Sequence, residues 1–306
     1  MNLDLKSVEL FIRIAALGAI DKAGDELGLS PTTASQRIQA LEDVIGSRSL
    51  VRTTRSVTLS AEGGVFLAHA KKILADVEDA VSDLQGDNKI LKGELRVTAS
   101  ASFGRRHIAP FVGEFLDEHP ELLIHLELSD GIFDIVQHGY DLAIRIGTLA
   151  PSTLKARKIA ASPRLLVASP AYLLKNGTPQ LPKDLTNHNC LALGENRGWT
   201  LNDVRGSATE IKVSGNFTTN YGEAVTEAAA AGQGIALKSN WDVIGHITEG
   251  TLLTVLPDYR VEPEWNVWAV RPPSRIIPPK VRLFTEFIEQ KLNTQNSIGQ
   301  CPFLQK

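Results

Sequence analysis

The sequence predicts a multi-domain α/β protein with a small helical N-terminal module, one long helix and two α/β lobes. Apolar residues recur at helical spacing through residues 5–45, a heptad repeat runs over residues 66–84, and strands alternate with helices from residue 93 onward. A chain of 306 residues is long for one hydrophobic core and suits two or three domains. The hydrophobic content of 43%, the charged content of 22% and the net charge of −3 describe an ordinary globular protein, so the overall charge indicates no particular partner.

The N-terminal module, residues 1–60, is built around a predicted helix-turn-helix at about residues 20–39. A short helix leads through a turn at Gly28-Leu29 into a second helix, for which Ser30 is a good N-cap and Pro31 a favourable first residue. Apolar residues then recur along the second helix with helical spacing: Ala34, Ile38, Leu41 and Ile45. Helix pairs of this kind place the second helix in the major groove of DNA.

The outward face of this second helix carries short or amide-bearing side chains, which suit contacts with base edges and phosphates. They are Thr32, Thr33, Ser35, Gln36 and Gln39, with Arg37 at the flank. The alternative is an ordinary amphipathic helix pair whose polar face meets only water.

A small hairpin, or wing, is predicted where residues 49–53 and 57–60 flank Thr54-Arg55. From this wing, Arg52 and Arg55 would reach the DNA backbone or a minor groove. The alternative is a solvated hairpin tip. The two arginines form a local basic edge where a phosphate contact would be needed.

Residues 61–88 predict a linker helix of about 25 residues, roughly 37 Å long. Its apolar residues alternate in spacings of four and three, as in a coiled-coil seam: Phe66, Ala70, Ile73, Val77, Ala80 and Leu84. Such a narrow stripe indicates a partner helix, and a two-fold dimer would present two recognition helices about 34 Å apart. The alternative is that the stripe packs against its own domain.

Residues 89–294 predict two α/β lobes, lobe I at about 93–160 with 269–294 and lobe II at about 161–268, followed by a tail at 295–306. In lobe I the expected elements form a βαβαβ unit with mainly parallel strands. They are strands at 93–100, 122–128 and 141–147, a helix at 105–119 and a short helix at 132–138. In lobe II and beyond we expect strands at 164–169, 190–194, 211–217, 234–237 and 265–270, and helices at 220–232, 240–247 and 279–293.

Two adjacent lobes imply a cleft at the carboxyl ends of their strands, which is where such folds bind ligands. Hydroxyl and amide side chains precede a helix in each lobe, and they would favour an anion: Ser100 and Ser102 in lobe I, and Thr218, Thr219 and Asn220 in lobe II. Arg145 could pair with a carboxylate. Alternatively, these polar residues are only helix caps, and Arg145 is a surface or interlobe charge.

The sequence contains little evidence for catalytic, metal-binding or redox sites. The seven histidines are scattered without a metal-ligand spacing, and neither a nucleophile motif nor a phosphate-binding loop occurs, so we expect no catalytic residue, metal or cofactor. Cys190 and Cys301 lack a CxxC or a Cys/His cluster, which leaves a redox pair as a minor alternative. No signal peptide and no membrane-spanning segment is recognisable, so we expect a cytoplasmic protein without a membrane partner.

Several blocks, in this order and spacing, are similar to the LysR-type transcriptional regulators. They are ELGLSPTTASQRIQALE (26–42), RTTRSVTLSAEG (52–63), GYDLAIRIG (139–147), LVASPAYL (166–173) and AAAAGQGIAL (228–237). The chain most resembles the subgroup that includes CrgA and the regulators of D-malate and aromatic-acid genes. The resemblance implies a winged helix-turn-helix, a dimerising linker helix and an effector domain like a type 2 periplasmic binding protein.

By the same resemblance, promoter DNA contacts fall on Pro31, Thr32, Ser35 and Gln36, with Arg52 and Arg55 in the wing. The chain departs from the family pattern at Gly24, where alanine is usual, and at Ser49, where an apolar residue is usual. We expect Gly24 to cost about 1 kcal/mol of helix stability and Ser49 to loosen the wing.

The expected function is therefore a DNA-binding regulator, and not an enzyme, whose partners are double-stranded promoter DNA, a small organic acid and further copies of itself. The resemblance implies a dimer or tetramer on an inverted repeat containing T-N11-A, with RNA polymerase as a further candidate partner. A solute-binding protein would explain only residues 93–290 and would need export. An enzyme on the same bilobed fold would leave the first 90 residues without a role.

Overall fold

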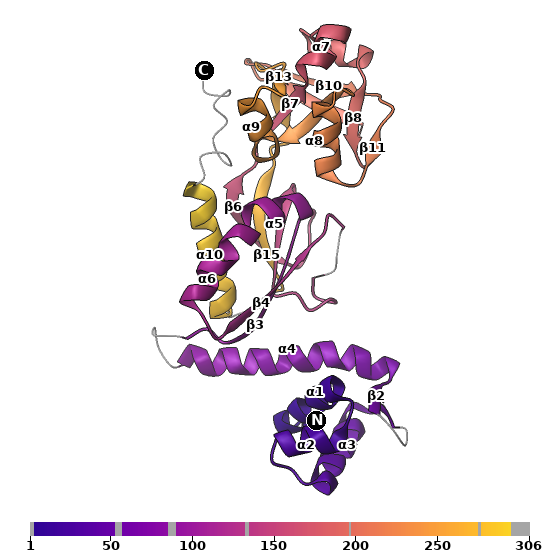
Figure 1. Cartoon of the computed structure of the whole chain (residues 1–306), viewed down its shortest axis with the longest axis vertical. Coiled ribbons are helices and arrows are strands. Elements are labelled where there is room, and N and C mark those ends of the chain that lie inside the picture. The colour runs from indigo at the N-terminus through magenta and orange to yellow at the C-terminus, as the bar shows by residue number, and fades with distance from the viewer. Residues whose placement is uncertain are drawn as a thin grey trace. The chain divides into compact units, whose positions relative to one another are not determined.

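The computed structural model describes residues 3–52, 57–84, 90–131, 135–195, 197–274 and 277–294. The described residues fall into two compact units (Figure 1). Unit 1 is drawn from residues 1–94 with 136–139, and unit 2 from residues 95–135 and 140–306. Each unit is described by itself. The predicted tail at 295–306 lies outside the described residues.

Unit 1 begins with the predicted three-helix module, whose helices are α1 (Leu5–Leu17), α2 (Ile20–Glu26) and α3 (Pro31–Ile45). The Ser30 hydroxyl accepts a hydrogen bond from the backbone N–H of Thr33, which caps α3 as the sequence predicts. The helices enclose a core of fully buried side chains: Val8, Leu10, Phe11, Ile14, Ala23, Ala34 and Ile38. The helix-turn-helix is thus confirmed as a fold.

Gly24 lies where α2 and α3 approach each other closely. A Cβ atom at this position would lie 3.1 Å from the Cβ of Ala34 and 3.3 Å from the carbonyl oxygen of Leu29. The close approach of the two helices therefore gives a packing reason for glycine that its low helix propensity alone did not suggest.

The wing is a hairpin of β1 (Leu50–Arg52) and β2 (Val57–Leu59), paired antiparallel. Its tip, which includes Arg55, lies outside the described residues. The expectation that Ser49 loosens the wing is wrong. Ser49 is fully buried, and both its hydroxyl and its N–H donate to Glu42 Oε1 of α3, which also accepts from the N–H of Leu50. The Glu42 carboxylate is buried and needs hydrogen-bond donors, and the Ser49 hydroxyl supplies one of them. Ser49 therefore links the wing to the recognition helix α3.

We expect Glu42→Ala to lower the free energy of unfolding of the N-terminal module by about 2–4 kcal/mol, because it leaves buried donors of Ser49 and Leu50 unsatisfied. Asp43→Ala, on the exposed neighbouring residue, is the matched control and should change stability by less than about 0.5 kcal/mol. Urea unfolding followed by circular dichroism measures both. Equal effects of the two variants would contradict this role of Glu42.

The linker helix is α4 (Ala61–Leu84), and its first half packs within unit 1. Phe66 contacts Phe11 of α1 with ring centroids 5.2 Å apart, and Ala70 is fully buried in the same core. The prediction that Ala70 lies in an intermolecular seam is therefore wrong. The same prediction for Phe66 overlooked its packing against α1 within unit 1. Ile73 is half-buried and Val77 is 37% exposed, while the side chains of Ala80 and Leu84 lie outside the described residues.

Lobe I of unit 2 contains a five-stranded sheet in the order β4-β3-β5-β15-β6. Its strands are β3 (Gly93–Ala99), β4 (Leu122–Leu128), β5 (Leu142–Gly147), β6 (Lys155–Ala161) and β15 (Asn266–Arg271). Strand β3 pairs parallel with β5, whereas β15 runs antiparallel to both β5 and β6. The sheet is mixed because the late strand β15 joins it antiparallel, whereas β6, antiparallel to β15, runs in the same direction as β5. The predicted parallel arrangement of the strands at 93–100 and 141–147 is confirmed.

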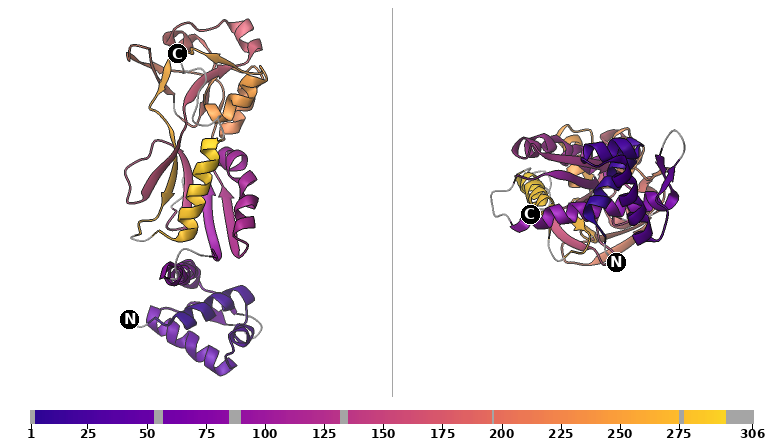
Figure 2. Two further views of the ribbon diagram at one scale, coloured as in Figure 1. Left: turned by 90° about the vertical axis from the view of Figure 1, so that its left-hand side faces the viewer. Right: turned by 90° about the horizontal axis from the view of Figure 1, so that it is seen from below.

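The helices of lobe I differ from the prediction in one respect. The single helix expected at 105–119 is two helices, α5 (Ala101–His107) and α6 (Ala109–Glu118). The break falls at Ile108 because Pro110 starts a new helix more readily than it continues one. Figure 2 shows α6 beside α10 (Pro279–Thr294), where Phe115 and Phe284 have ring centroids 5.1 Å apart. Residues 135–139, expected to end a short helix, form a turn, and 132–134 lie outside the described residues.

Lobe II contains a second five-stranded sheet, in the order β11-β8-β12-β7-β13. The strands are β7 (Arg164–Ala168), β8 (Cys190–Leu193), β11 (Thr218–Thr219), β12 (Ile235–Ser239) and β13 (Leu253–Val255). A three-stranded sheet, β10-β9-β14, lies in the same lobe, with β9 (Gly198–Asn202), β10 (Ala208–Lys212) and β14 (Arg260–Glu262). The strand predicted at 211–217 is thus wrong. Its residues are divided between the end of β10 and the loop before β11.

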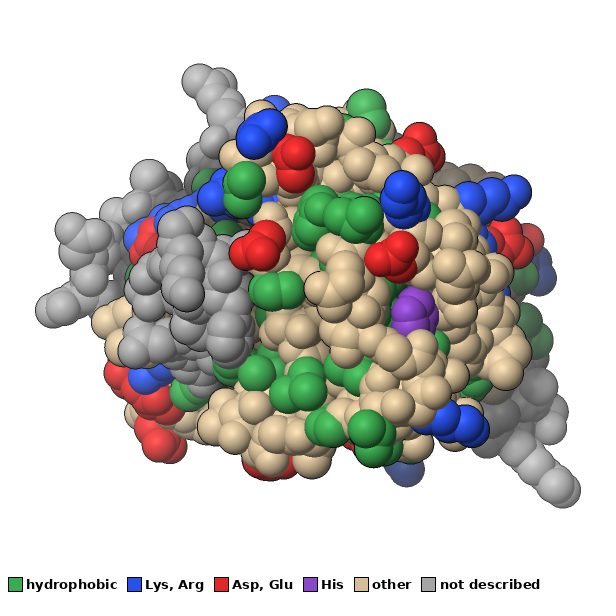
Figure 3. Space-filling view, turned by 90° about the horizontal axis from the view of Figure 1, so that it is seen from above, with side chains coloured by type: hydrophobic (Ala, Val, Ile, Leu, Met, Phe, Trp, Pro, Cys, Tyr) green, Lys and Arg blue, Asp and Glu red, His purple; other side chains and the backbone are tan. Residues whose placement is uncertain are grey.

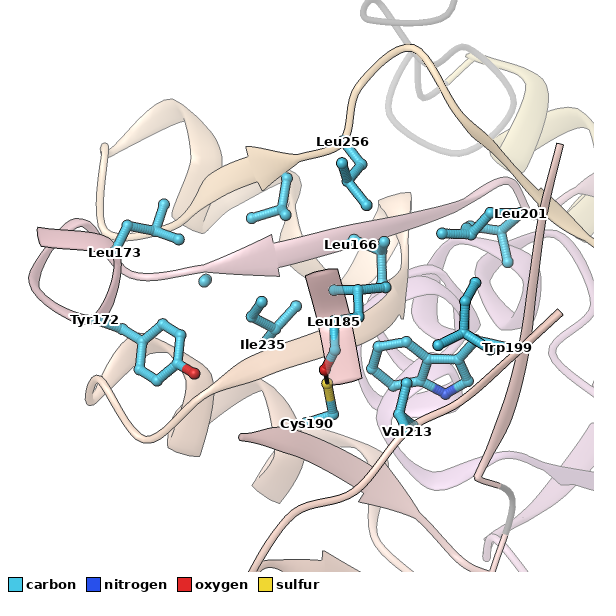
Figure 4. Close-up of a cluster of buried hydrophobic side chains, with 14 residues drawn as sticks. Leu166, Tyr172, Leu173, Leu185, Cys190, Trp199, Leu201, Val213, Ile235 and Leu256 are labelled. Atoms are coloured by element: carbon cyan, nitrogen blue, oxygen red, sulfur yellow. Dashed lines mark hydrogen bonds between the residues drawn. The ribbon is translucent and has the colours of Figure 1, made fainter. Parts of the chain in front are cut away.

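Helices α7 (Pro170–Asn176), α8 (Gly222–Ala230) and α9 (Asn240–Thr248), with the 3-10 helix η1 (Pro182–Asn187), complete lobe II. One buried hydrophobic cluster joins Leu166 and Ile235 of the large sheet to Trp199 and Leu201 of the small one (Figure 4). Seen from the lobe II end, the surface mixes hydrophobic and charged side chains (Figure 3).

The chain crosses between the lobes twice, through residues 162–163 after β6 and through residues 263–265 before β15. The two crossing segments are joined by a hydrogen bond of 2.9 Å from the N–H of Ser162 to the carbonyl oxygen of Trp265. They therefore form the hinge between the lobes. Within the described residues, no helix is long and apolar enough to cross a membrane, and no group of three or more His, Cys, Asp or Glu side chains could hold a metal ion.

Candidate functional site

The recognition helix α3 divides its predicted DNA-contacting residues into two groups. Pro31, Thr32 and Gln36 are exposed and Ser35 is half-exposed, so these four remain available to a partner. Thr33 instead shares a hydrogen bond of 2.8 Å with the Ser30 hydroxyl at the cap.

Arg37 also has a partner inside the module. Its Nη1 lies 3.6 Å from Asp4 Oδ2, the carboxylate that caps α1. This pair reduces the positive charge that the helix presents outward. In the wing, the structure describes the backbone of Arg52 in β1, whereas Arg55 lies outside the described residues.

The second site is a cavity of about 490 Å³ between the two large sheets of unit 2. Lobe I, lobe II and the hinge all contribute to its lining. The lining residues are Ser100, Ser102, Phe103, Asp130, Ile146, Arg164, Leu191, Leu193, Gly194, Trp199, Asn220, Gly222, Leu237, Lys238, Ser239, Trp241, Asp242 and Trp265. The volume falls within the range of small-molecule sites, roughly 300–1,000 Å³.

The cavity brings together three of the six predicted effector-binding residues, Ser100, Ser102 and Asn220. Ser102 is 5% exposed, and its hydroxyl bonds to the side chain of Tyr221, which precedes α8. Because α5 has only seven residues and Ser100 does not cap it with its side chain, the helix terminus is a weaker anion site than the sequence suggested.

Thr218 and Thr219 do not line the cavity, because they form β11 and do not cap a helix. Strand β11 pairs parallel with β8, and Thr218 Oγ1 accepts a hydrogen bond of 2.6 Å from Arg197 Nη2. Helix α8 starts later than predicted, after Tyr221.

Arg145 is also absent from the cavity lining. It is half-buried on β5, where its Nη1 donates to the carbonyl oxygen of Ser129 at 3.1 Å and its Nη2 to Thr98 Oγ1 at 3.3 Å. Ile146, the next residue on the strand, does line the cavity, and neighbouring residues of a strand point to opposite faces. The structure therefore does not place Arg145 where a ligand in the cavity would need it.

Arg164, the first residue of β7, occupies the position that Arg145 was expected to fill. It lines the cavity, is only 9% exposed, and stacks over the Trp265 ring at 4.3 Å. Its Nη2 donates to the carbonyl oxygen of Pro263, while its Nε is buried without a hydrogen-bond partner. Burial lowers the pKa of Arg164 to about 10, because Glu262 only partly offsets the loss of solvent. Arg164 is thus a buried cation without an ion pair in the described part of the chain.

A compact ionic network borders the cavity beside α5. Asp242 at the start of α9 is 2% exposed, with Oδ2 lying 2.7 Å from Lys238 Nζ and Oδ1 lying 3.2 Å from Arg106 Nη1. Arg105 and Arg106 of lobe I also pair with Glu223 of lobe II. These contacts, together with the T-shaped packing of Phe103 on Trp241, link the two lobes. The network holds Lys238 and Asp242 to each other, which leaves Arg164 as the unsatisfied charge.

Two family profiles match the chain and together cover both units. The profile described as "Bacterial regulatory helix-turn-helix protein, lysR family" matches residues 5–64, and the "LysR substrate binding domain" profile matches residues 89–293. The chain belongs to the LysR family of transcriptional regulators.

Relatives along nearly the whole chain agree with this LysR-family assignment. The "HTH-type transcriptional regulator DmlR" of Escherichia coli K12 is 37% identical over 290 residues, which is 94% of each chain. The solved structure of CrgA, "a LysR-type transcriptional regulator from Neisseria meningitidis", is 27% identical with a TM-score of 0.59, and the match covers 95% of this chain and 99% of CrgA. The full-length Vibrio cholerae activator AphB is 26% identical with a TM-score of 0.57, covering 94% and 98%. The chain is therefore a DNA-binding transcriptional regulator with a substrate-binding domain, and its relatives are regulators rather than enzymes.

The buried cysteine of this LysR-family chain is not a reactive thiol. Cys190 is fully buried and its Sγ contacts the carbonyl oxygen of Leu185 at 3.6 Å (Figure 4). Burial raises the pKa of Cys190 to about 12, so the thiolate needed for redox chemistry is absent at neutral pH. Cys301, the other half of the suggested pair, lies outside the described residues.

The cavity residues that the sequence did not reveal are Arg164 and the aromatic side chains Trp199, Trp241 and Trp265. Arg164 did leave a signal in the sequence, because a charged residue there opens the predicted strand at 164–169 and is followed by the apolar run LLVA. A buried charge of this kind needs a partner, whether from the protein or from a ligand. The tryptophans left none, since they are brought together only by the packing of segments far apart in the sequence.

For DNA binding, we expect Gln36→Ala to weaken specific operator binding by about 1–3 kcal/mol while leaving the salt dependence nearly unchanged, since an amide reads base edges. Arg52→Ala should weaken binding to all sequences and reduce the slope of log K against log salt by about one. Fluorescence anisotropy at several salt concentrations separates the two. Gln39→Ala, whose amide already donates to Asp43 within α3, is the control and should have the smaller effect.

Proposed function

We propose that this regulator binds promoter DNA and that a small organic acid, bound in the cavity between the lobes, controls this binding in the cytoplasm. One observation carries the proposal of an acid: Arg164 is a buried guanidinium on the cavity wall without an ion-pair partner in the described residues. A bound carboxylate would supply the missing charge and accept hydrogen bonds from the guanidinium.

The position of Arg164 supports control of the lobe arrangement. Arg164 directly follows one crossing segment, and its side chain stacks on Trp265 and donates to Pro263 in the other. An anion bound to Arg164 would therefore influence both crossing segments of the hinge. The ion pairs of Arg106 with Glu223 and Asp242 would then favour one of two lobe arrangements. The ligand shifts this equilibrium only by its difference in affinity for the two arrangements.

We further propose that α4 forms the dimer through its second half. Val77 is 37% exposed within unit 1, and Ile73 on the same stripe is half-buried. Two such modules would present two recognition helices, in line with the family's expected inverted-repeat operators. A dimer of dimers on DNA and contact with RNA polymerase belong to this proposal.

The dimer proposal predicts that Val77→Asp gives a species of about half the mass by light scattering, because an aspartate would be buried in the seam. The matched control is Val65→Asp on the same helix, at a residue that is 65% exposed, which should keep the wild-type mass. An unchanged mass of the Val77→Asp variant would remove this residue from the dimer contact.

The experiment that tests the proposed function combines DNA retardation with an acid screen. The purified protein should retard its own upstream intergenic DNA and not a heterologous fragment, and at least one small carboxylate should raise its thermal midpoint and alter the retardation. Equal retardation of both fragments would count against specific regulation. The absence of any shift across a broad set of small carboxylates would count against an acid effector.

A further inference from the structure

We infer that the effector is a monocarboxylate with a flat, mostly apolar body, such as an aromatic acid, and not a hydroxylated dicarboxylate. This inference rests on the proposed function, because it names the class of acid that binds in the same cavity. It follows from the ion pairing of the charged side chains in the lining and from the kind of side chains that surround Arg164.

The ion pairs of the lining leave one cation that could pair with a ligand carboxylate. Four charged side chains line the cavity, and of the two cations only Arg164 has no ion pair among the described residues. Lys238 lies 2.7 Å from Asp242 and donates to the carbonyl oxygen of Gly222 at 2.6 Å. Freeing Lys238 for a second carboxylate would uncouple a pair that is 93–98% buried, which is strongly unfavourable.

The two carboxylates of the lining also act against a dianion. Asp242 is held in place by Lys238, Arg106 and the Thr226 hydroxyl, and Asp130 accepts a hydrogen bond of 2.8 Å from the N–H of Ala101. Asp242 already has its cation partners, so it offers no free cation to a second ligand carboxylate, and the exposed Asp130 carboxylate would repel one.

The rest of the lining is apolar and rich in aromatic rings. The chain has four tryptophans, and three of them line this cavity, together with Phe103 and the aliphatic side chains of Ile146, Leu191, Leu193 and Leu237. The stacked Arg164–Trp265 pair presents a planar surface beside the anion-binding group. Flat π-systems pack favourably on such surfaces, whereas a polyhydroxylated chain would leave its hydroxyls without partners.

The polar groups in the lining are few and mostly engaged. Ser239 Oγ accepts a hydrogen bond from Ser162 Oγ at 3.0 Å, and the buried Ser102 hydroxyl bonds to the Tyr221 side chain. Ser100 and Asn220 are the polar side chains of the lining that one ring substituent, or the carboxylate itself, could use. The lining therefore suits an amphiphilic acid with its charge at one end.

Calorimetry and tryptophan fluorescence on the full-length protein test this inference with benzoate, cyclohexanecarboxylate, succinate, malate and neutral benzyl alcohol. We expect benzoate to bind at least tenfold more tightly than succinate or malate, to exceed cyclohexanecarboxylate, and to quench tryptophan emission. Trp265→Leu should weaken benzoate binding about fivefold or more. The control is Trp268→Leu, at the one tryptophan outside the lining, which should leave the affinity unchanged.

The outcomes separate this inference from the proposed function. Tighter binding of succinate or malate would overturn the aromatic monocarboxylate and keep an acid effector. Equal binding of benzyl alcohol and benzoate would overturn the role of the carboxylate and keep the apolar site. If none of the five compounds bound while another carboxylate shifted the thermal midpoint, the inference would fail alone. If no carboxylate bound at all, both would fail.

Discussion

Arg164→Gln is expected to weaken binding of a carboxylate effector by roughly 10- to 150-fold, which corresponds to the 1.5–3 kcal/mol of a hydrogen bond to a charged group. Glutamine keeps a hydrogen-bond donor at this position but removes the charge. Because the pKa of Arg164 is about 10, the side chain is protonated throughout the neutral range, and wild-type affinity should stay constant from pH 6.5 to 8.5 and fall above pH 10. Isothermal titration calorimetry measures both effects.

The control for this prediction is Arg145→Gln, because Arg145 is the residue that the sequence suggested. Its guanidinium is bound to Ser129 and Thr98 and does not line the cavity, so the affinity for the acid should change by less than about threefold. Thermal midpoints of both variants establish that they are folded. A large loss with Arg145→Gln together with none for Arg164→Gln would reverse the assignment of the anion-binding arginine.

Asp242→Asn is expected to lower the free energy of unfolding by about 3–5 kcal/mol, which is the cost of removing one partner from a buried ion pair. Asp242 and Lys238 are 2% and 7% exposed, and without the carboxylate the lysine ammonium remains buried beside a neutral amide. Arg106 loses one of its two lobe II carboxylate partners, Asp242, and keeps the other, Glu223. Chemical denaturation of the full-length protein, followed by tryptophan fluorescence, measures the change.

Glu286→Gln is the matched control, since Glu286 pairs with Arg282 on the surface of α10, where both side chains are more than 40% exposed. An exposed helical pair of this kind contributes about 0.3–0.5 kcal/mol. Similar effects of the two substitutions would contradict the role of Asp242 as the centre of the interlobe network. A large effect of Asp242→Asn alone would support it.

Local patterns in the sequence were sufficient to predict the helices that are specified by their own caps and apolar spacing. The Ser30 cap, Pro31 and the apolar spacing of α3 specify the helix-turn-helix, and the structure has the helix where they predict it. The length of α4 followed from its heptads in the same way. What the heptads could not specify is which surface the stripe meets, so Ala70 was assigned to a dimer seam although it belongs to the core of its own module.

Long-range packing decided the rest. Strand β15 enters the lobe I sheet antiparallel from more than 100 residues away, a pairing that no local pattern encodes. The cavity has the same origin, because Arg164 and Trp265 lie 101 positions apart in the sequence and meet only at the hinge. Arg145 was chosen as the anion-binding residue because it ends a recognisable strand. The alternation of side chains along that strand places it away from the cavity.

The wrong expectation for Ser49 has a third cause, which is its unrecognised partner Glu42. Ser49 departs from the usual apolar residue of the wing, and taken alone it reads as a loss of packing. The structure gives it a compensating partner, because Glu42 accepts hydrogen bonds from both its hydroxyl and its N–H. A substitution that looks unfavourable in isolation can thus be half of a buried pair that the sequence does not identify.

Operator titration in the presence and absence of a saturating acid, for the wild type and for Arg164→Gln, tests the central claim most directly. By linkage, an acid that changes operator affinity must itself bind with an affinity that the operator changes by the same factor. We predict that an acid concentration just sufficient to saturate the wild type changes its operator affinity or DNA bending and changes those of Arg164→Gln much less, because the variant binds the acid more weakly, while both proteins bind the operator equally without acid. An equal response in the two proteins, or no response in the wild type, would contradict control through this cavity.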